Sequence, residues 1–156
     1  MDITLKAEHV NPFIQATIQM FATMVKMKVE AGRIRIKESG AESYDVTGVI
    51  GFSGGAKGSV SLSFPRATAH GVVASFLGEE KVTTNQITDA VGELANIVAG
   101  SAKHDLAKYR LAISLPTVIL GDRHVVAGHG DSVAVVIPFE SPVGKFDLAV
   151  TFKSLI

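Results

Sequence analysis

Residues 144–152 have the sequence GKFDLAVTF, in which apolar side chains occupy every second position from Phe146 to Phe152. Successive side chains of a β-strand point to opposite faces of a sheet, so this period of two predicts a strand with one buried face. Apolar runs bounded by turn residues predict further strands at residues 34–36, 46–52, 60–64, 111–120, 124–127 and 133–139. We expect the first three of these to form one antiparallel stretch.

Helical periodicity, with apolar residues every three or four positions, predicts helices at residues 12–28, 65–78 and 83–109. In the first helix, Asn11 is expected to be the N-cap and Pro12 the first helical residue, because proline lacks the N–H that a helix start leaves unbonded. The third helix is expected to start at Thr83, whose spacing to Gln86 is that of a capping box.

The order of these elements repeats along the chain. Phe52, Gly58, Val60 and Leu62 have counterparts at nearly constant offset in Phe139, Gly144, Phe146 and Leu148. This indicates an internal duplication, with pseudo-repeats at about residues 8–64 and 84–153 in one domain spanning residues 1–156. The predicted fold class is α+β, with helix-strand-strand-strand units forming an antiparallel sheet of six or more strands, covered by two long helices and a short one.

Composition narrows the function classes. Lys and Arg together number 15, as do Asp and Glu, and no basic run occurs, so nucleic acid is not an expected partner. The chain has no cysteine, which excludes disulfides and thiolate chemistry and fits a cytoplasmic location. It also shows no signal peptide at its start and no apolar run of roughly 18 residues, so we expect neither export by that route nor membrane insertion.

The helix predicted at residues 83–109 carries the candidate site. On a helical wheel Asp89, Glu93, Asn96 and Gly100 fall together, opposite a broad apolar arc, and Gly92 flanks them. Asn and Gly are poor helix formers, so their presence on a solvent-facing side indicates a use other than helix stability. We interpret the face, with Lys103 beyond it, as a docking surface where glycines let a partner's backbone approach closely.

These residues resemble a known family. Asp89-x-x-x-Glu93-x-x-Asn96, followed by Pro116, is similar to the signature of the CheC, CheX and FliY chemotaxis phosphatases, and the string Gly92 to Gly100 carries most of the likeness. The Val10 to Ile14, Gly51 to Gly55 and Pro116 to Val118 segments resemble the CheX branch, so the likeness spans nearly the whole chain. Pro116 follows Asn96 slightly sooner than in the family pattern, which implies a shortened loop.

The resemblance implies a CheC-like fold and an enzyme that hydrolyses the aspartyl phosphate of a CheY-type response regulator. Asn96 would orient the attacking water and Glu93 would pair with the active-site lysine of the regulator. Asp89, Gly92, Gly100 and Lys103 would contact the same partner. No cofactor is expected on this chain, because Mg²⁺ would be held by the acidic residues of the regulator. The resemblance also implies a homodimer joined through sheet edges, for which the strand Phe146 to Phe152 is a candidate.

A binding module that docks a regulator or a motor component without hydrolysis remains the alternative function. Glu8 and Asn11 repeat the Glu/Asn spacing, but a helix beginning at Pro12 would leave Glu8 outside it, so we expect no second site there. The glycine-rich residues 51–59 are expected to form a hairpin turn and not a phosphate-binding loop, since a strand follows. His124, His129 and Asp131 are expected to lie in a loop without binding metal.

Overall fold

The computed structural model describes residues 6–37, 43–121 and 134–156. Its helical elements are α1 (Ala7–Met20), the π-helix η1 (Phe21–Val25), α2 (Arg66–Leu77), α3 (Thr84–Asp105) and the 3-10 helix η2 (Ala107–Tyr109). Its strands are β1 (Glu30–Ala31), β2 (Arg35–Lys37), β3 (Val46–Ser53), β4 (Ala56–Phe64), β5 (Ala112–Ile113), β6 (Thr117–Leu120), β7 (Ala134–Ser141) and β8 (Gly144–Ser154). In these ranges no helix is long and apolar enough to cross a membrane.

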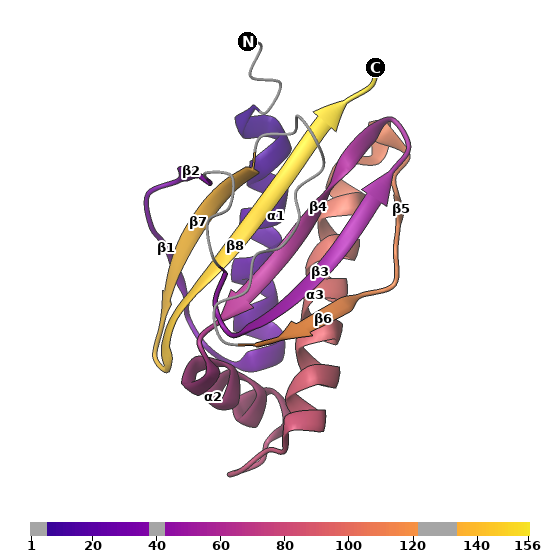
Figure 1. Ribbon diagram of the computed structural model, residues 1–156. Coiled ribbons are helices and arrows are strands. Elements are labelled where there is room, and N and C mark those ends of the chain that lie inside the picture. Colours follow the sequence, from indigo (N-terminus) through magenta and orange to yellow (C-terminus); the bar gives the residue numbers. More distant parts are fainter. Residues whose placement is uncertain (1–5, 38–42, 122–133) are drawn as a thin grey trace.

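The molecule has two layers, a twisted antiparallel sheet and the helices that cover one of its faces. Figure 1 shows α1 and α3 side by side behind the sheet, with α2 at one end. The eight strands form one sheet in which the order β7-β8-β4-β3 makes the centre. The α+β fold class and the predicted sheet of six or more strands are therefore confirmed.

The two halves of the chain exchange their short strands. β1 and β2, which precede the hairpin β3-β4, pair with β7 of the other hairpin. β5 and β6, which precede the hairpin β7-β8, pair in turn with β3. The prediction that residues 34–36 join the β3-β4 stretch is thus wrong, because their partner strand lies about 100 residues further along the chain. We infer that this two-fold pattern reflects the predicted duplication.

The alternating strand is central to the sheet and not at its edge. β8 pairs with β4 on one side, with Val60 opposite Val150, and with β7 on the other, with Val135 also opposite Val150. Its inward side chains Phe146, Leu148 and Val150 are completely buried. The proposal that this strand supplies a dimer edge is therefore wrong, since both of its edges are already hydrogen-bonded.

The first helix starts earlier than predicted. α1 begins at Ala7 and contains Pro12, so Asn11 lies within the helix and is not its N-cap. The reason is tertiary: His9 is buried, its Nε2 lies 2.8 Å from the Tyr109 hydroxyl, and its ring stacks on Phe152 at 4.3 Å. This anchor holds the turn before Pro12 in helical form, although proline at the sixth position of α1 removes the N–H that would bond to the Glu8 carbonyl.

Two glycines allow α3 to approach the sheet closely. A Cβ atom at Gly48 of β3 would lie 3.1 Å from the Val91 carbonyl oxygen and 3.2 Å from the Ala95 Cβ of α3. A Cβ atom at Gly92 of α3 would lie 3.3 Å from a methyl group of Val118 in β6. The backbones of helix and sheet therefore meet where no side chain intervenes, which fixes the position and the rotation of α3.

The close approach can be tested with Gly48→Val. Valine has a higher strand propensity than glycine, yet its methyl groups would overlap α3, so we expect the variant to lose about 1–3 kcal/mol of unfolding free energy. Gly51→Val is the matched control in the same strand, because the nearest atom to its Cβ would be 3.7 Å away. Urea unfolding measures both, and equal stability of the two variants would contradict the packing argument.

Candidate functional site

The helix that carries the site is defined at its start by its own residues. The Thr83 hydroxyl accepts a hydrogen bond from the Gln86 N–H at 3.2 Å, and the Gln86 side chain accepts one from the Thr83 N–H at 2.9 Å. The predicted capping box is confirmed. The inward arc of α3 is buried against the sheet and α1, as the periodicity predicted: Ile87, Ala90, Val91, Leu94, Val98 and Ala102.

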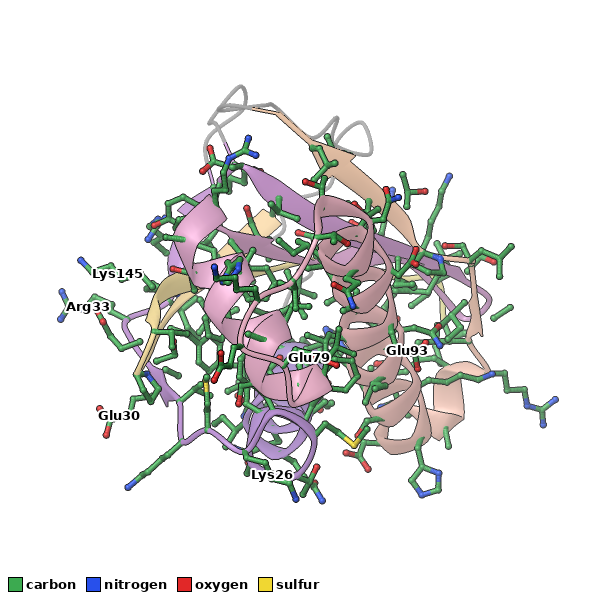
Figure 2. All side chains as sticks on the ribbon, turned by 90° about the horizontal axis from the view of Figure 1, so that it is seen from below. Lys26, Glu30, Arg33, Glu79, Glu93 and Lys145 are labelled. Atoms are coloured by element: carbon green, nitrogen blue, oxygen red, sulfur yellow. The ribbon has the colours of Figure 1, made fainter. Side chains whose placement is uncertain are left out.

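The opposite arc faces outward along the whole of α3. Asp89, Glu93 and Lys103 are exposed, while Asn96 and Gly100 are half-buried. Figure 2 shows Glu93 on the outer surface of this helix. The side chains that the sequence placed on one face therefore do share that face, on an uninterrupted helix from Thr84 to Asp105.

Glu93 and Asn96 make no hydrogen bond or ion pair within the described ranges. Residues three apart on a helix have Cβ atoms about 5–6 Å from each other, so one docked partner can contact both. In this position the Glu93 carboxylate can accept hydrogen bonds from a cation. The oxygen of the Asn96 carboxamide can accept one from a polarised O–H group. Both groups are free to be used by another molecule.

The two glycines beside this pair differ in their surroundings. Gly92 is buried, and its missing side chain makes room for Pro116 and Val118, so it has a reason within the fold. Among the described residues, none outside its own stretch of helix has an atom within 4 Å of where the Cβ of Gly100 would be. A glycine costs about 1 kcal/mol in a helix relative to alanine, and for Gly100 no internal packing explains that cost.

The loop between β5 and β6 lies against the same part of α3. Pro116 lies beside Gly92, where the added Cβ would be 3.6 Å from its ring, and the preceding Leu115 is 88% exposed. This exposed apolar residue directly precedes Pro116, which lies beside Gly92. Sequence reasoning missed Leu115, because it placed this residue inside one strand at residues 111–120, whereas the structure has a break between β5 and β6.

The second Glu/Asn pair must be reconsidered. Glu8 and Asn11 both lie on α1 and are exposed, so the expectation that Glu8 precedes the helix is wrong. The pair differs from that on α3, because the Glu8 carboxylate lies 3.6 Å from the Nε2 atom of buried His9. That Glu8 and Asn11 form no working site therefore stays a prediction, although its original reason fails.

A separate polar cluster occupies the sheet between β2 and β8. Asp147 lies 3.4 Å from Arg35, and burial raises the pKa of its carboxyl against the opposing effect of Arg35 and Lys37. Burial likewise lowers the pKa of Lys37 and raises the pKa of Tyr44. None of these residues belongs to α3, so the shifts concern the sheet and not the candidate site.

The remaining sequence predictions have different outcomes. β3 ends at Ser53 and β4 begins at Ala56, which confirms the hairpin turn within residues 51–59. His124, His129 and Asp131 lie outside the described residues, as does the strand predicted at residues 124–127. Among the residues that the structure describes, no group of three or more His, Asp or Glu is placed to hold a metal ion.

Comparison with known proteins identifies the family of the chain and its fold. The family model described as chemotaxis phosphatase CheX matches residues 46–140. The CheY-P phosphatase CheX of Thermotoga maritima is 27% identical over an alignment of 156 positions. The alignment covers 96% of this chain and 99% of the relative.

Solved structures have the same fold. A CheC-like superfamily protein from Shewanella sp. PV-4 is 30% identical, with a TM-score of 0.86 over 96% of this chain and 100% of its own. The structure of a CheX-CheY-BeF3-Mg²⁺ complex from Borrelia burgdorferi matches at a TM-score of 0.78 and 21% identity, over 96% of this chain and 100% of that one, which shows the shared fold alone. The family model covers more than half of this chain, and the chain therefore belongs to the chemotaxis phosphatase CheX family.

Proposed function

We propose that this protein dephosphorylates the aspartyl phosphate of a CheY-type response regulator through Asn96 and Glu93. The observation that carries the proposal is the pair itself, an exposed carboxylate and a half-buried carboxamide three residues apart on α3, neither engaged within the described ranges. Membership of the CheX family supports the reaction class, and the Thermotoga maritima relative is named a CheY-P phosphatase.

Asn96 acts by positioning water. An acyl phosphate is already reactive, so the main requirement is a water molecule held in line with the bond between phosphorus and the aspartyl oxygen. The Asn96 carboxamide oxygen accepts a hydrogen bond from this water. The water oxygen bonds to phosphorus as the aspartyl P–O bond breaks, and the electron pair of that bond returns to the aspartate. Inorganic phosphate leaves as H2PO4⁻, which carries both protons of the attacking water. A neutral amide does not repel the phosphoryl oxygens.

Glu93 acts in docking. Its carboxylate pairs with the lysine of the regulator's phosphorylation site, one helical turn from Asn96. Mg²⁺ belongs to the regulator, where carboxylates are the hard oxygen ligands that it prefers, and it offsets the phosphoryl charge there. The chain described here contributes the two side chains and a helix face against which the regulator rests.

Asn96→Ala is expected to reduce the acceleration of regulator dephosphorylation about 10²-fold, because the water loses its orientation. The measurement is the decay of phosphorylated candidate regulators from the same organism, with and without this protein. Asn85→Ala, which removes another exposed amide from α3, and Asn11→Ala on α1 are both expected to retain full acceleration. Undiminished acceleration by Asn96→Ala would reject its role, and binding without any acceleration by the wild type would favour the non-catalytic module.

Glu93→Gln is expected to weaken regulator binding about two- to fivefold and to make binding less dependent on salt, because an exposed ion pair contributes up to about 1 kcal/mol and is screened by ions. Glu79→Gln is the matched control, an exposed carboxylate between α2 and α3 (Figure 2). Calorimetry at two ionic strengths measures the affinity of each variant for the regulator and the dependence of that affinity on salt. An identical salt dependence in wild type and Glu93→Gln would remove the ion pair from the proposal.

We also propose that the protein is a homodimer joined through a sheet edge. The edges available are the β1/β2 side, where Ile36 is 61% exposed, and the β5/β6 side, where Leu120 is 46% exposed. Light scattering at micromolar concentration is expected to give twice the chain mass of 16.4 kDa. A mass of one chain would contradict the dimer.

A further inference from the structure

A pocket of about 540 Å³ opens at the C-terminal end of α3. Its apolar part is formed by Ala107 of η2 together with Leu111 and Ile113, which lead into β5. Leu111 is buried and Ile113 is half-buried, so these side chains form a fixed apolar floor. The remaining lining residues come from α3 and from the turn that follows η2, and they are Gly100, Lys103, His104 and Arg110.

The pocket continues the face that carries the candidate catalytic pair. At 100° per residue, Gly100 lies between Glu93 and Asn96 on the helical wheel, and Lys103 and His104 lie within about 20° of either side of that pair. Gly100, Lys103 and His104 all line the pocket. At 1.5 Å rise per residue, Gly100 is about 6 Å and Lys103 about 10 Å along the axis from Asn96. A globular partner that covers Asn96 must therefore also cover the pocket.

Three cationic or basic side chains surround the opening, and no carboxylate is among the described residues that line it. Lys103, His104 and Arg110 are all exposed, and within the described ranges none of their side chains makes an ion pair or a hydrogen bond. The exposed Asp105 of α3 is not among the lining residues. This arrangement favours a ligand that carries negative charge at its edge and an apolar group at its centre.

The backbone holds Arg110 at the rim. Arg110 has a φ of 49°, in the left-handed region that arginine rarely adopts. A Cβ atom at Gly54 would meet the Arg110 carbonyl oxygen at 2.5 Å, and the Gly55 N–H donates to the Tyr109 carbonyl at 2.7 Å. Tyr109 is itself buried and in hydrogen-bond contact with His9. The backbone that presents the arginine is therefore fixed by the β3-β4 turn and by α1.

Gly100 lies between this rim and the catalytic pair. With no atom within 4 Å of its Cβ position, its lack of a side chain leaves open space on the surface of α3 and serves no contact within the described ranges. Gly92, on a different side of the same helix, is the contrasting case. Pro116 and Val118 occupy the space that a side chain at Gly92 would fill. The space at Gly100 is what a partner entering the pocket would occupy.

We propose that this pocket is the second anchor of the regulator-binding surface, and that it receives an acidic segment of the response regulator. Carboxylates of that segment pair with Lys103 and Arg110, while an adjacent apolar side chain lies over Leu111 and Ile113. The inference rests on the proposed function, because its occupant is the same regulator whose phosphoryl group meets Asn96. It assigns substrate affinity, and not the chemical step, to this end of α3.

The test is the double variant Lys103→Gln/Arg110→Gln, assayed on the regulator that the wild type dephosphorylates. Each exposed ion pair lost weakens binding about two- to fivefold, so KM is expected to rise about 5- to 20-fold with kcat within twofold of wild type. The control is Arg33→Gln/Lys145→Gln, which removes the same charges on the side of the molecule away from Glu93 (Figure 2) and is expected to leave KM unchanged. An unchanged KM in the pocket variant, or an equal rise in the control, overturns the proposal.

A steric variant tests the space itself. Gly100→Leu is expected to raise KM at least 10-fold while the melting temperature stays the same or rises, because a Cβ atom at this position meets no described atom beyond its own stretch of helix and the leucine replaces a glycine in a helix. Normal KM in a folded Gly100→Leu protein would show that nothing enters the pocket. If the wild type accelerates hydrolysis but neither variant changes KM, the pocket proposal fails alone. If the wild type neither binds nor accelerates hydrolysis of any regulator, both proposals fail.

Discussion

The close packing of α3 against the sheet is the constraint on which the rest of the structure depends. The missing side chain of Gly48 in β3 makes room for the backbone of α3 at Val91. The missing side chain of Gly92 in α3 makes room for Pro116 and Val118. A helix seated in this way on two glycines cannot turn about its axis without a clash. Since neighbouring residues lie 100° apart on a helix, a rotation by one position would carry Glu93 or Asn96 toward the interior. The outward direction of the candidate pair is therefore a property of the interface on the other side of the helix.

That interface is built from both halves of the chain. α3 belongs to the second half, whereas β3 belongs to the first, and β6 reaches across to pair with β3 from Val46 to Val49. His9 near the start of α1 contacts Tyr109 beyond the end of α3, 100 residues away. The middle of α3 and the segment beyond its C-terminal end are thus in contact with residues from the other half. The exchange of strands makes the site a product of the whole fold and not of one repeat.

The outer face of α3 carries residues that lower the stability of the helix but leave its surface accessible to a partner. Asn96 and Gly100 are poor helix formers, and together they cost an isolated helix more than 1 kcal/mol relative to alanine. The capping box at Thr83 and the buried inner arc offset this cost, because a capping residue contributes about 1 kcal/mol and each buried aliphatic side chain roughly 1.5–3 kcal/mol. The helix can therefore carry side chains chosen for a partner on one face while the other face secures it.

The sequence by itself determined the features that depend on near neighbours. The period of two in β8, the capping box of α3, the end of α2 at Gly78 and the shared face of Glu93 and Asn96 all follow from residues that are close in the chain. Strand order and the start of α1 depend on contacts between residues that are distant in the chain. Pro12 argued locally for a helix start, but the buried contact of His9 with Tyr109 outweighed it. Likewise, β8 carries the same alternation whether it is central or at an edge, so only tertiary pairing with β4 and β7 decided its place. The pocket beside Gly100 was decided by tertiary structure too, because it arises where η2 and β5 fold back beside α3 and no local pattern records that approach.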